Sequence, residues 1–352
     1  MNDLSRKLQK VLDDAVASGE ECGCQLTVYR HGKLLCDLHS GWLDETHTQK
    51  VDSQTVFPIF SVGKGILATL YHILAARGVF SDTDLVAKYW PEYAAAGKEN
   101  TAIQDILTHR SGLYCFPEGY PLEDWFNWQK ACSALEKMTP QSPVGGKHHY
   151  HAHTFGILLG RLIEKAAGEE LCHLLQKEIL DPLNIGTFFY GLPEERFSNL
   201  AKLVPADSAQ LADMRLQFNR KCILAEKNPS SNGTANAHSL ARIYASLIED
   251  GVDGIRLIDE PALKHALILR RSADDPVKNE WDKFGLGYAL CGPEAPWKRM
   301  FGHGGACGSE GFADRETGYA VGFTKNKLNR THPVHPVRNR ISEVLGIPIR
   351  IW

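Results

Sequence analysis

The chain has 352 residues, of which 43% are hydrophobic, and its 39 basic and 42 acidic side chains leave a formal net charge of -3. This length and composition are typical of a folded protein with a large core, arranged in two lobes more readily than in one. The nearly balanced charge, without a block of like charges, excludes a nucleic-acid footprint and a polybasic membrane patch, so we expect a small-molecule substrate.

The first residues and the cysteines indicate a cytoplasmic location. Met1 leads directly into a predicted amphipathic helix over residues 3–17, without the apolar core and cleavage site of a secretory signal. No run is long and apolar enough to predict a membrane span. The nine cysteines are scattered and lack a C-x-x-C pair, which fits a reduced compartment better than a disulfide framework. The sequence does not indicate an oligomeric state.

After the first helix, two predicted strands over residues 23–29 and 34–38 are joined by a turn at 30–33. Gly32 suits the positive φ that such a tight turn requires. We therefore expect a β-hairpin near the N-terminus.

A lone Ser-x-x-Lys motif, Ser61 to Lys64, follows an apolar extended run. Pro58 favours extended geometry just before it, Ser61 falls where a helix N-cap belongs, and apolar residues then recur at three- and four-residue steps. Residues three apart share one helix face, so the Lys64 amine can reach the Ser61 hydroxyl. An apolar setting favours the neutral amine that a general base must be. The alternative is an exposed lysine beside an ordinary N-cap serine.

Residues 65–250 are predicted to be mostly helical, and strands return over 284–290, 309–313 and 319–324 before a closing helix over 336–345. Strands at both ends of a helical middle predict an α+β fold, an α/β sandwich. Its antiparallel sheet is formed from the N- and C-terminal segments and flanked by helices, with an inserted, mostly helical lobe. We expect a sheet domain from residues 1–80 and 235–352, and an inserted helical domain over 81–234.

Four histidines fall within residues 148–153, beside Tyr150. They lack the His-Glu-x-x-His and His-x-His-x-Asp spacings of metal sites, so we expect no metal and no cofactor. Tyr150 precedes a predicted helix over 156–167, and a phenol there can shuttle a proton if a nearby cation lowers its pKa. The alternative is a surface or packing tyrosine.

Four glycines lie within residues 301–309, close to His303. The run predicts either a flexible hinge or a backbone that approaches a ligand closely, with an N–H directed at a developing oxyanion. A phosphate loop is excluded, because no Gly-Lys-Ser/Thr ending follows.

Taken together, these motifs resemble the serine β-lactamase and penicillin-binding-protein superfamily, particularly class C β-lactamases and the related family VIII carboxylesterases. Ser61 to Lys64 matches the Ser-x-x-Lys motif, Tyr150-His151-Ala152 stands where the family has Tyr-x-Asn, and His303-Gly304-Gly305 stands where it has Lys-Thr-Gly. Residues 101–113 and 302–314 also look similar. The resemblance extends from the first hairpin to about residue 325.

The resemblance implies a β-lactamase/transpeptidase-like fold with Ser61 as the acylated nucleophile, Lys64 as its base and Tyr150 as a proton shuttle. The oxyanion hole would be the backbone N–H groups of Ser61 and Ala306. His303, Gly304 and Gly305 would line the substrate pocket, and Cys307, beside the expected donor, would make the site sensitive to thiol reagents.

Departures from the family pattern shift the expected substrate. The family has Asn, Lys and Thr where this chain has Ala152, His303 and Gly304, and those three residues hold a β-lactam. A neutral histidine lacks the fixed positive charge of the lysine. We therefore expect a serine hydrolase that cleaves carboxylic esters through an acyl-enzyme. The alternatives are a β-lactamase, a D-amino-acid peptidase or amidase, an acyltransferase, and a non-catalytic ligand-binding protein on the same scaffold.

Overall fold

The structure is a computed structural model that describes residues 2–270, 283–291, 299–328 and 335–350. Its helices are α1 (Asp3–Ala17), α2 (Val62–Ala76), α3 (Ile103–Leu107), α4 (Leu122–Phe126), α5 (Trp128–Lys137), α6 (Thr154–Ala167), α7 (Leu171–Leu175), α8 (Lys221–Leu224), α9 (Ala237–Ala245), α10 (Glu260–Ala266) and α11 (Pro336–Leu345). Its strands are β1 (Gly23–Arg30), β2 (Lys33–Gly41), β3 (Phe57–Pro58), β4 (Phe188–Tyr190), β5 (Gly233–Ala235), β6 (Ala289–Cys291), β7 (Met300–Gly304), β8 (Glu310–Asp314) and β9 (Tyr319–Lys325). Short 3₁₀ and π turns are η1 (Val86–Lys88), η2 (Pro91–Ala94), η3 (Gln176–Leu180), η4 (Glu194–Asn199), η5 (Ser208–Gln210) and η6 (Met214–Asn219).

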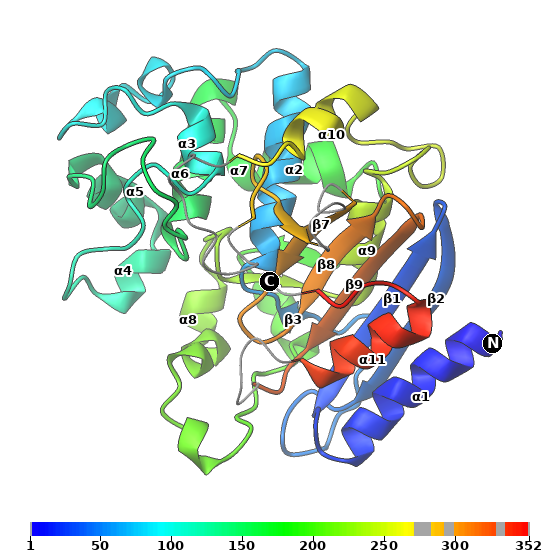
Figure 1. The fold of residues 1–352 in the computed structure, drawn as a ribbon. Coiled ribbons are helices and arrows are strands. Elements are labelled where there is room, and N and C mark those ends of the chain that lie inside the picture. Colours follow the sequence, from blue (N-terminus) through cyan, green and yellow to red (C-terminus); the bar gives the residue numbers. More distant parts are fainter. Residues whose placement is uncertain (1, 271–282, 292–298, 329–334, 351–352) are drawn as a thin grey trace.

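The main sheet has six antiparallel strands in the order β2-β1-β9-β8-β7-β6. The N-terminal hairpin joins the C-terminal strands through β1 and β9, with Cys24 opposite Lys325. Figure 1 shows the blue hairpin beside the orange β9, with the helical middle of the chain to one side. The predicted α+β fold, with one sheet built from both ends of the chain, is confirmed. The division into domains at residues 80 and 235 stays a prediction.

Helices cover both faces of this sheet. On β9, Val321 and Phe323 pack in one apolar cluster with residues of α1 and α11, whereas Ala320 packs in another with residues of α9. This alternation follows from the two-residue period of a strand. Gly322 lets α9 approach closely, because a Cβ there would lie 2.1 Å from the carbonyl oxygen of Ala237.

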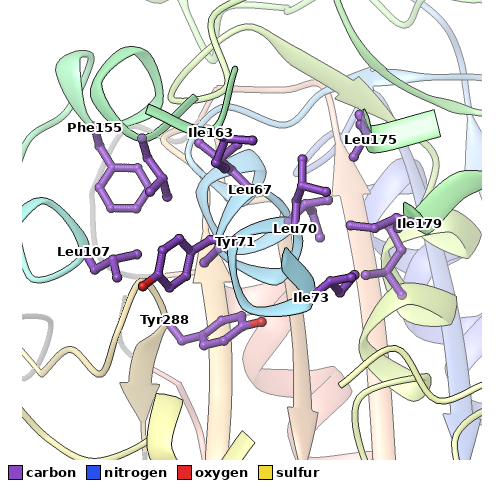
Figure 2. Packing of buried hydrophobic residues seen from close by; sticks show 14 of the residues in the cluster. Leu67, Leu70, Tyr71, Ile73, Leu107, Phe155, Ile163, Leu175, Ile179 and Tyr288 are labelled. Carbon is purple, nitrogen blue, oxygen red and sulfur yellow. The ribbon is translucent and has the colours of Figure 1, made fainter. Parts of the chain in front are cut away.

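Helix α2 runs through the interior and is buried from Val62 to Leu74. Figure 2 shows Leu67, Leu70 and Tyr71 packed among side chains from distant parts of the chain, including Phe155 and Tyr288. A helix that is apolar on all sides requires such an enclosure. The enclosure fixes the N-terminal end of α2, where Ser61 and Lys64 lie.

A second sheet, β3-β5-β4, was not predicted from the sequence. Its first strand pairs Phe57 with Ala235, and the Ile59 amide donates to the Gly233 carbonyl at 2.9 Å. The extended run before Ser61 is therefore held by residues that lie far along the chain.

The late strands correct part of the prediction. The expected strand over 284–290 is wrong except at its end, since Gly287 has a φ of +84° and the Gly285 amide donates to Tyr288 within a turn. Strand β7 begins the glycine-rich stretch over residues 301–309, for which the sequence also allowed a flexible hinge. Its Gly302 is required by the register, because a Cβ there would lie 2.2 Å from the Gly311 carbonyl oxygen on β8.

In the part of the chain that the structure describes, none of the helices has both the length and the apolar character that crossing a membrane requires.

Candidate active site

Ser61 lies between β3 and α2, at the N-cap position of the helix. Its side chain makes no capping hydrogen bond and is half-buried, so the hydroxyl is not used to close the helix. The preceding residue, Phe60, has a φ of +48°, a left-handed conformation that costs a bulky residue roughly 1–3 kcal/mol. Strain of this kind is often found at functional sites.

Lys64 is fully buried and makes three close contacts through its amine. Nζ lies 2.9 Å from Oγ of Ser61, 2.8 Å from the carbonyl oxygen of Ala152 and 2.8 Å from the carbonyl oxygen of Ser230. The predicted Ser61–Lys64 contact is therefore present. The two carbonyls come from the Tyr150–Ala152 loop and from the turn before β5.

The partners of Lys64 suit a neutral amine. Carbonyl oxygens only accept hydrogen bonds, so the two N–H groups of a neutral amine donate to Ala152 and Ser230 and the lone pair faces the Ser61 hydroxyl. Burial also lowers the pKa of Lys64 well below its usual value of 10.5. A neutral amine hydrogen-bonded to a serine hydroxyl can take the proton of that hydroxyl.

Lys98 provides a contrast within the same chain. Its side chain is also 0% exposed, but its amine contacts three carbonyl oxygens, those of Ala95, Glu136 and Met138, at 2.6, 3.0 and 2.6 Å. Three acceptors require three N–H groups, which only the charged ammonium has. Lys98 is therefore a charged ammonium with a structural role, whereas one of the three contacts of Lys64 is to a serine hydroxyl.

Tyr150 lies next to this pair, with the Lys64 amine 5.1 Å from its ring centroid and a hydrogen bond to the Ser61 side chain. The residue is 39% exposed, so a substrate can reach it. Tyr150 is partly open to solvent, but the surrounding atoms still desolvate its hydroxyl, and this raises its pKa. The hydrogen bond to Ser61 lowers the pKa by a smaller amount. The exposed fraction means that a substrate can reach Tyr150. The raised pKa means that its side chain is a neutral phenol. The condition stated from the sequence, a pKa lowered by a nearby cation, is not met, because desolvation raises the pKa of Tyr150.

His303 lies on β7 beside the first turn of α2, its Cβ 3.6 Å from the position of a Cβ on Gly65. Its Nδ1 lies 2.8 Å from the Gly304 carbonyl oxygen, which only accepts, so the proton is on Nδ1. Burial lowers the pKa of His303 to about 3, with a smaller contribution from Lys64. The position where the resemblance has a lysine therefore holds an uncharged ring.

Two histidines of the predicted stretch, His151 and His153, are held neutral close to this centre. His151 lies 2.8 Å from Ser111 Oγ and 2.5 Å from the His149 carbonyl oxygen, and burial lowers its pKa to about 3. Burial also lowers the pKa of His153 to about 4. Over the described ranges, no group of three or more His, Cys, Asp or Glu side chains is arranged to hold a metal ion.

Ala306 lies in a turn after β7 that packs against the chain before Ser61. Gly305 packs on the chain before Ser61, since a Cβ on it would lie 2.3 Å from the Ile59 carbonyl oxygen. The Gly308 amide donates to the Gly305 carbonyl at 2.8 Å, which closes the turn. Among the described residues, the backbone amides of Ser61 and Ala306 donate to no protein acceptor, so both remain available to an incoming oxygen.

Cys307 follows Ala306 but points into the protein. It is 0% exposed, and its Sγ lies 3.6 Å from the Pro58 carbonyl oxygen. Contrary to the sequence expectation, a thiol reagent has no surface of Cys307 to attack in the folded protein.

Two residues of the site were not predicted from the sequence. Nothing in the sequence around Ser230 indicates that its carbonyl meets Lys64. His109 is buried, has a φ of +59°, and lies 4.8 Å from Tyr150 between ring centroids. Its Nδ1 accepts from the His151 amide at 3.1 Å, which ties the Tyr150 loop to the end of α3.

A cavity of about 500 Å³ lies elsewhere, at the C-terminal end of α2. Tyr71, His72 and Phe80 line it together with residues of the following loop, and it contains none of the predicted site residues. The chemistry described above is therefore at the opposite end of the helix from this cavity.

Comparisons with known proteins agree with the geometry. Over 335 residues, the chain is 29% identical to the esterase/beta-lactamase LipL of Mycobacterium tuberculosis, a match that covers 87% of this chain and 77% of that protein. It is 26% identical over 263 residues to the esterase EstB of Burkholderia gladioli, covering 68% of this chain and 63% of EstB. A family VIII carboxylesterase structure superposes with a TM-score of 0.85 at 25% identity, covering 97% of both chains.

These matches confirm the predicted resemblance and the prediction of an enzyme related to carboxylesterases and β-lactamases. A penicillin-binding-protein homologue from Caulobacter crescentus also superposes with a TM-score of 0.84 at 27% identity, over 98% of this chain and 97% of that one. The family model described as Beta-lactamase matches residues 8–345. The chain belongs to the Beta-lactamase family of serine hydrolases.

Proposed function

We propose that this protein hydrolyses carboxylic esters through an acyl-enzyme on Ser61. The proposal rests on the contacts of the Lys64 amine. Two of them are hydrogen bonds to carbonyl oxygens, and the third, at 2.9 Å, is to the Ser61 hydroxyl. A nucleophile with a neutral, buried base is what acyl transfer requires. Relatives named esterase and carboxylesterase support the same reaction class.

Acylation follows from these positions. Lys64 takes the proton of the Ser61 hydroxyl, and Oγ forms a bond to the ester carbonyl carbon. The carbonyl oxygen becomes an oxyanion, which the amides of Ser61 and Ala306 stabilise. When the C–O bond to the alcohol breaks, the neutral phenol of Tyr150 gives its proton to the departing oxygen and regains one from Lys64.

Deacylation reverses these roles. A water molecule attacks the acyl carbon and gives a proton to the Tyr150 oxygen, while Tyr150 gives its own proton to Lys64. The bond to Oγ then breaks, and Lys64 returns that proton to Ser61. Because the Tyr150 pKa is raised, the phenol acts mainly as a proton donor and relay, and Lys64 holds the proton between the steps.

The charge of the site favours an uncharged substrate. His303 is neutral, and the buried His151 and His153 have lowered pKa values, so none of these histidines supplies a fixed cation for a substrate carboxylate. A β-lactam carries a carboxylate and would leave it uncompensated there. A neutral ester has no such cost.

The test compares short-chain p-nitrophenyl esters with a chromogenic cephalosporin, using the wild type and Ser61→Ala. We expect the wild type to hydrolyse the esters, the variant to lose about 10³-fold or more of that activity, and the cephalosporin to be a poor substrate. Wild-type inertness toward a broad ester panel, or an unaffected Ser61→Ala enzyme, would contradict the proposal.

A further inference from the structure

We propose that Arg215 is a positioning residue that holds the oxyanion turn through the carbonyl of Ala306, an inference that rests on the proposed function. Nη1 of Arg215 donates to the Ala306 carbonyl oxygen at 2.7 Å. Arg215 lies on η6, a segment that the sequence analysis did not connect with the site. The contact spans 91 residues of sequence, so local geometry does not impose it.

The peptide planes on either side of Ala306 are each held by one hydrogen bond. The plane that carries the Ala306 N–H ends in the Gly305 carbonyl, which accepts from the Gly308 amide at 2.8 Å inside the turn. The following plane carries the Ala306 carbonyl, which accepts from Arg215 outside the turn. Without Arg215 this second plane loses its hydrogen bond, and the turn that carries the Ala306 N–H loses its tie to η6.

Arg215 is itself held in place. Its Nε lies 3.0 Å from both carboxylate oxygens of Asp213, and its Nη2 lies 2.6 Å from one of them. This planar pairing fixes the guanidinium and leaves Nη1 to reach Ala306. The Arg215 and Asp213 side chains are only 25% and 19% exposed, so solvent screens the pair less than it would on an open surface.

The same segment contacts the other half of the expected oxyanion hole. The ring of Phe218 lies 4.7 Å from the ring of Phe60, the strained residue before Ser61. The end of η6 is anchored because Asn219 exchanges hydrogen bonds with the backbone of Leu203 at 2.7 and 2.9 Å. One short segment therefore braces both chain positions whose amides would bind the oxyanion.

The experiment measures ester hydrolysis and inhibition by an alkyl boronic acid, a tetrahedral mimic, in the wild type, Arg215→Met and Arg215→Lys. We expect Arg215→Met to lower kcat about tenfold with KM within about twofold, since a displaced donor costs less than a deleted one. Boronic acid affinity should fall by the same factor, because it reports the oxyanion position. Arg215→Lys should recover part of both losses.

Arg220→Met is the matched control. Arg220 directly follows η6 and pairs with Glu123 at 3.1 Å. It should leave kcat and boronic acid affinity unchanged, and all variants should keep the wild-type melting temperature within a few degrees. Unchanged kcat and inhibitor affinity in Arg215→Met, or equal losses in Arg220→Met, overturn the inference alone. A wild type without esterase activity contradicts the proposed function and this inference with it.

Discussion

The Lys64 amine lies 2.8 Å from the carbonyl oxygen of Ala152, a contact that uses the backbone of the second motif and not its side chain. Replacing the family's Asn by Ala at this position therefore removes a group that would meet the substrate but leaves the support of Lys64 intact. At this position the backbone carbonyl holds the Lys64 amine, whichever side chain the residue carries.

Lys64→Arg and Lys64→Met should both lower kcat/KM for a neutral ester by about 10³-fold or more, because neither side chain supplies a neutral amine. In the wild type, activity should rise with pH as Lys64 loses its proton, and this limb should lie well below pH 10.5 because burial lowers the pKa of Lys64.

Lys98→Met is the control for burying a lysine elsewhere. Lys98 meets only carbonyl oxygens and lies outside the site, so this variant should lose stability but keep the kcat of the folded enzyme. Steady-state kinetics beside thermal melts separate the two effects. Ester hydrolysis by Lys64→Arg at the wild-type rate would remove Lys64 from its role as base.

Gly305→Ala should lower kcat/KM at least about tenfold, because the added methyl would lie 2.3 Å from the Ile59 carbonyl oxygen and push the 305–308 turn away from Ser61. Gly186→Ala provides the comparison, since a Cβ at Gly186 meets nothing within 4 Å. Kinetics on a single ester decide the matter: similar activity in the two variants would show that the position of this turn has no effect on catalysis.

His303→Lys should shift selectivity toward substrates that carry a carboxylate. The wild-type ring is neutral, with a pKa of about 3, and a lysine would introduce the charge that the site lacks. We expect the ratio of kcat/KM for a p-nitrophenyl hemisuccinate to that for p-nitrophenyl butyrate to rise by about tenfold. His39→Lys adds the same charge at an exposed position on β2 and should not change the ratio. A ratio that stays constant in His303→Lys would contradict the charge-based account of specificity.

Acidification below pH 6.5 should cost the protein stability through its buried histidines. Burial lowers the pKa of His72 from 6.5 to about 4. Between these two pH values His72 is therefore protonated in the unfolded chain and neutral in the folded protein. The histidine contribution to stability is constant above pH 6.5 and falls between pH 6.5 and about 4, by about 1.4 kcal/mol per pH unit for each such histidine. Glu21 acts in the opposite direction, because burial raises its pKa to about 7.

His72→Gln tests this linkage away from the active site. Glutamine can still donate to the Leu286 carbonyl, which His72 contacts at 2.8 Å, but it cannot bind the proton. Denaturant unfolding between pH 6 and 4.5 should show a pH slope smaller by about one proton. Exposed His39→Gln should keep the wild-type slope, and an unchanged slope in His72→Gln would refute the assignment.

The sequence was sufficient for the local part of this site. The Ser61–Lys64 contact follows from helical spacing, and the hairpin, α2 and β9 follow from apolar periodicity. The supports of Lys64 are not local: the Ala152 and Ser230 carbonyls lie 88 and 166 residues away along the chain. Composition cannot reveal such contacts, because any residue has a carbonyl.

Glycine was the main source of error. In β7, Gly302 serves close strand packing, whereas at Gly287 a φ of +84° breaks the predicted strand. Glycine thus allows close packing of neighbouring strands in one place and a turn in another. Which of the two forms depends on the partner strands, which the local sequence does not show.

The most direct test of the acyl-enzyme on Ser61 is intact-mass spectrometry of the wild type and Ser61→Ala, quenched in acid during turnover of a short-chain ester. The account predicts a single acyl adduct on the wild type, located on the peptide that contains Ser61, and none on the variant. An unmodified wild type under turnover, or an adduct that persists in Ser61→Ala, would contradict it.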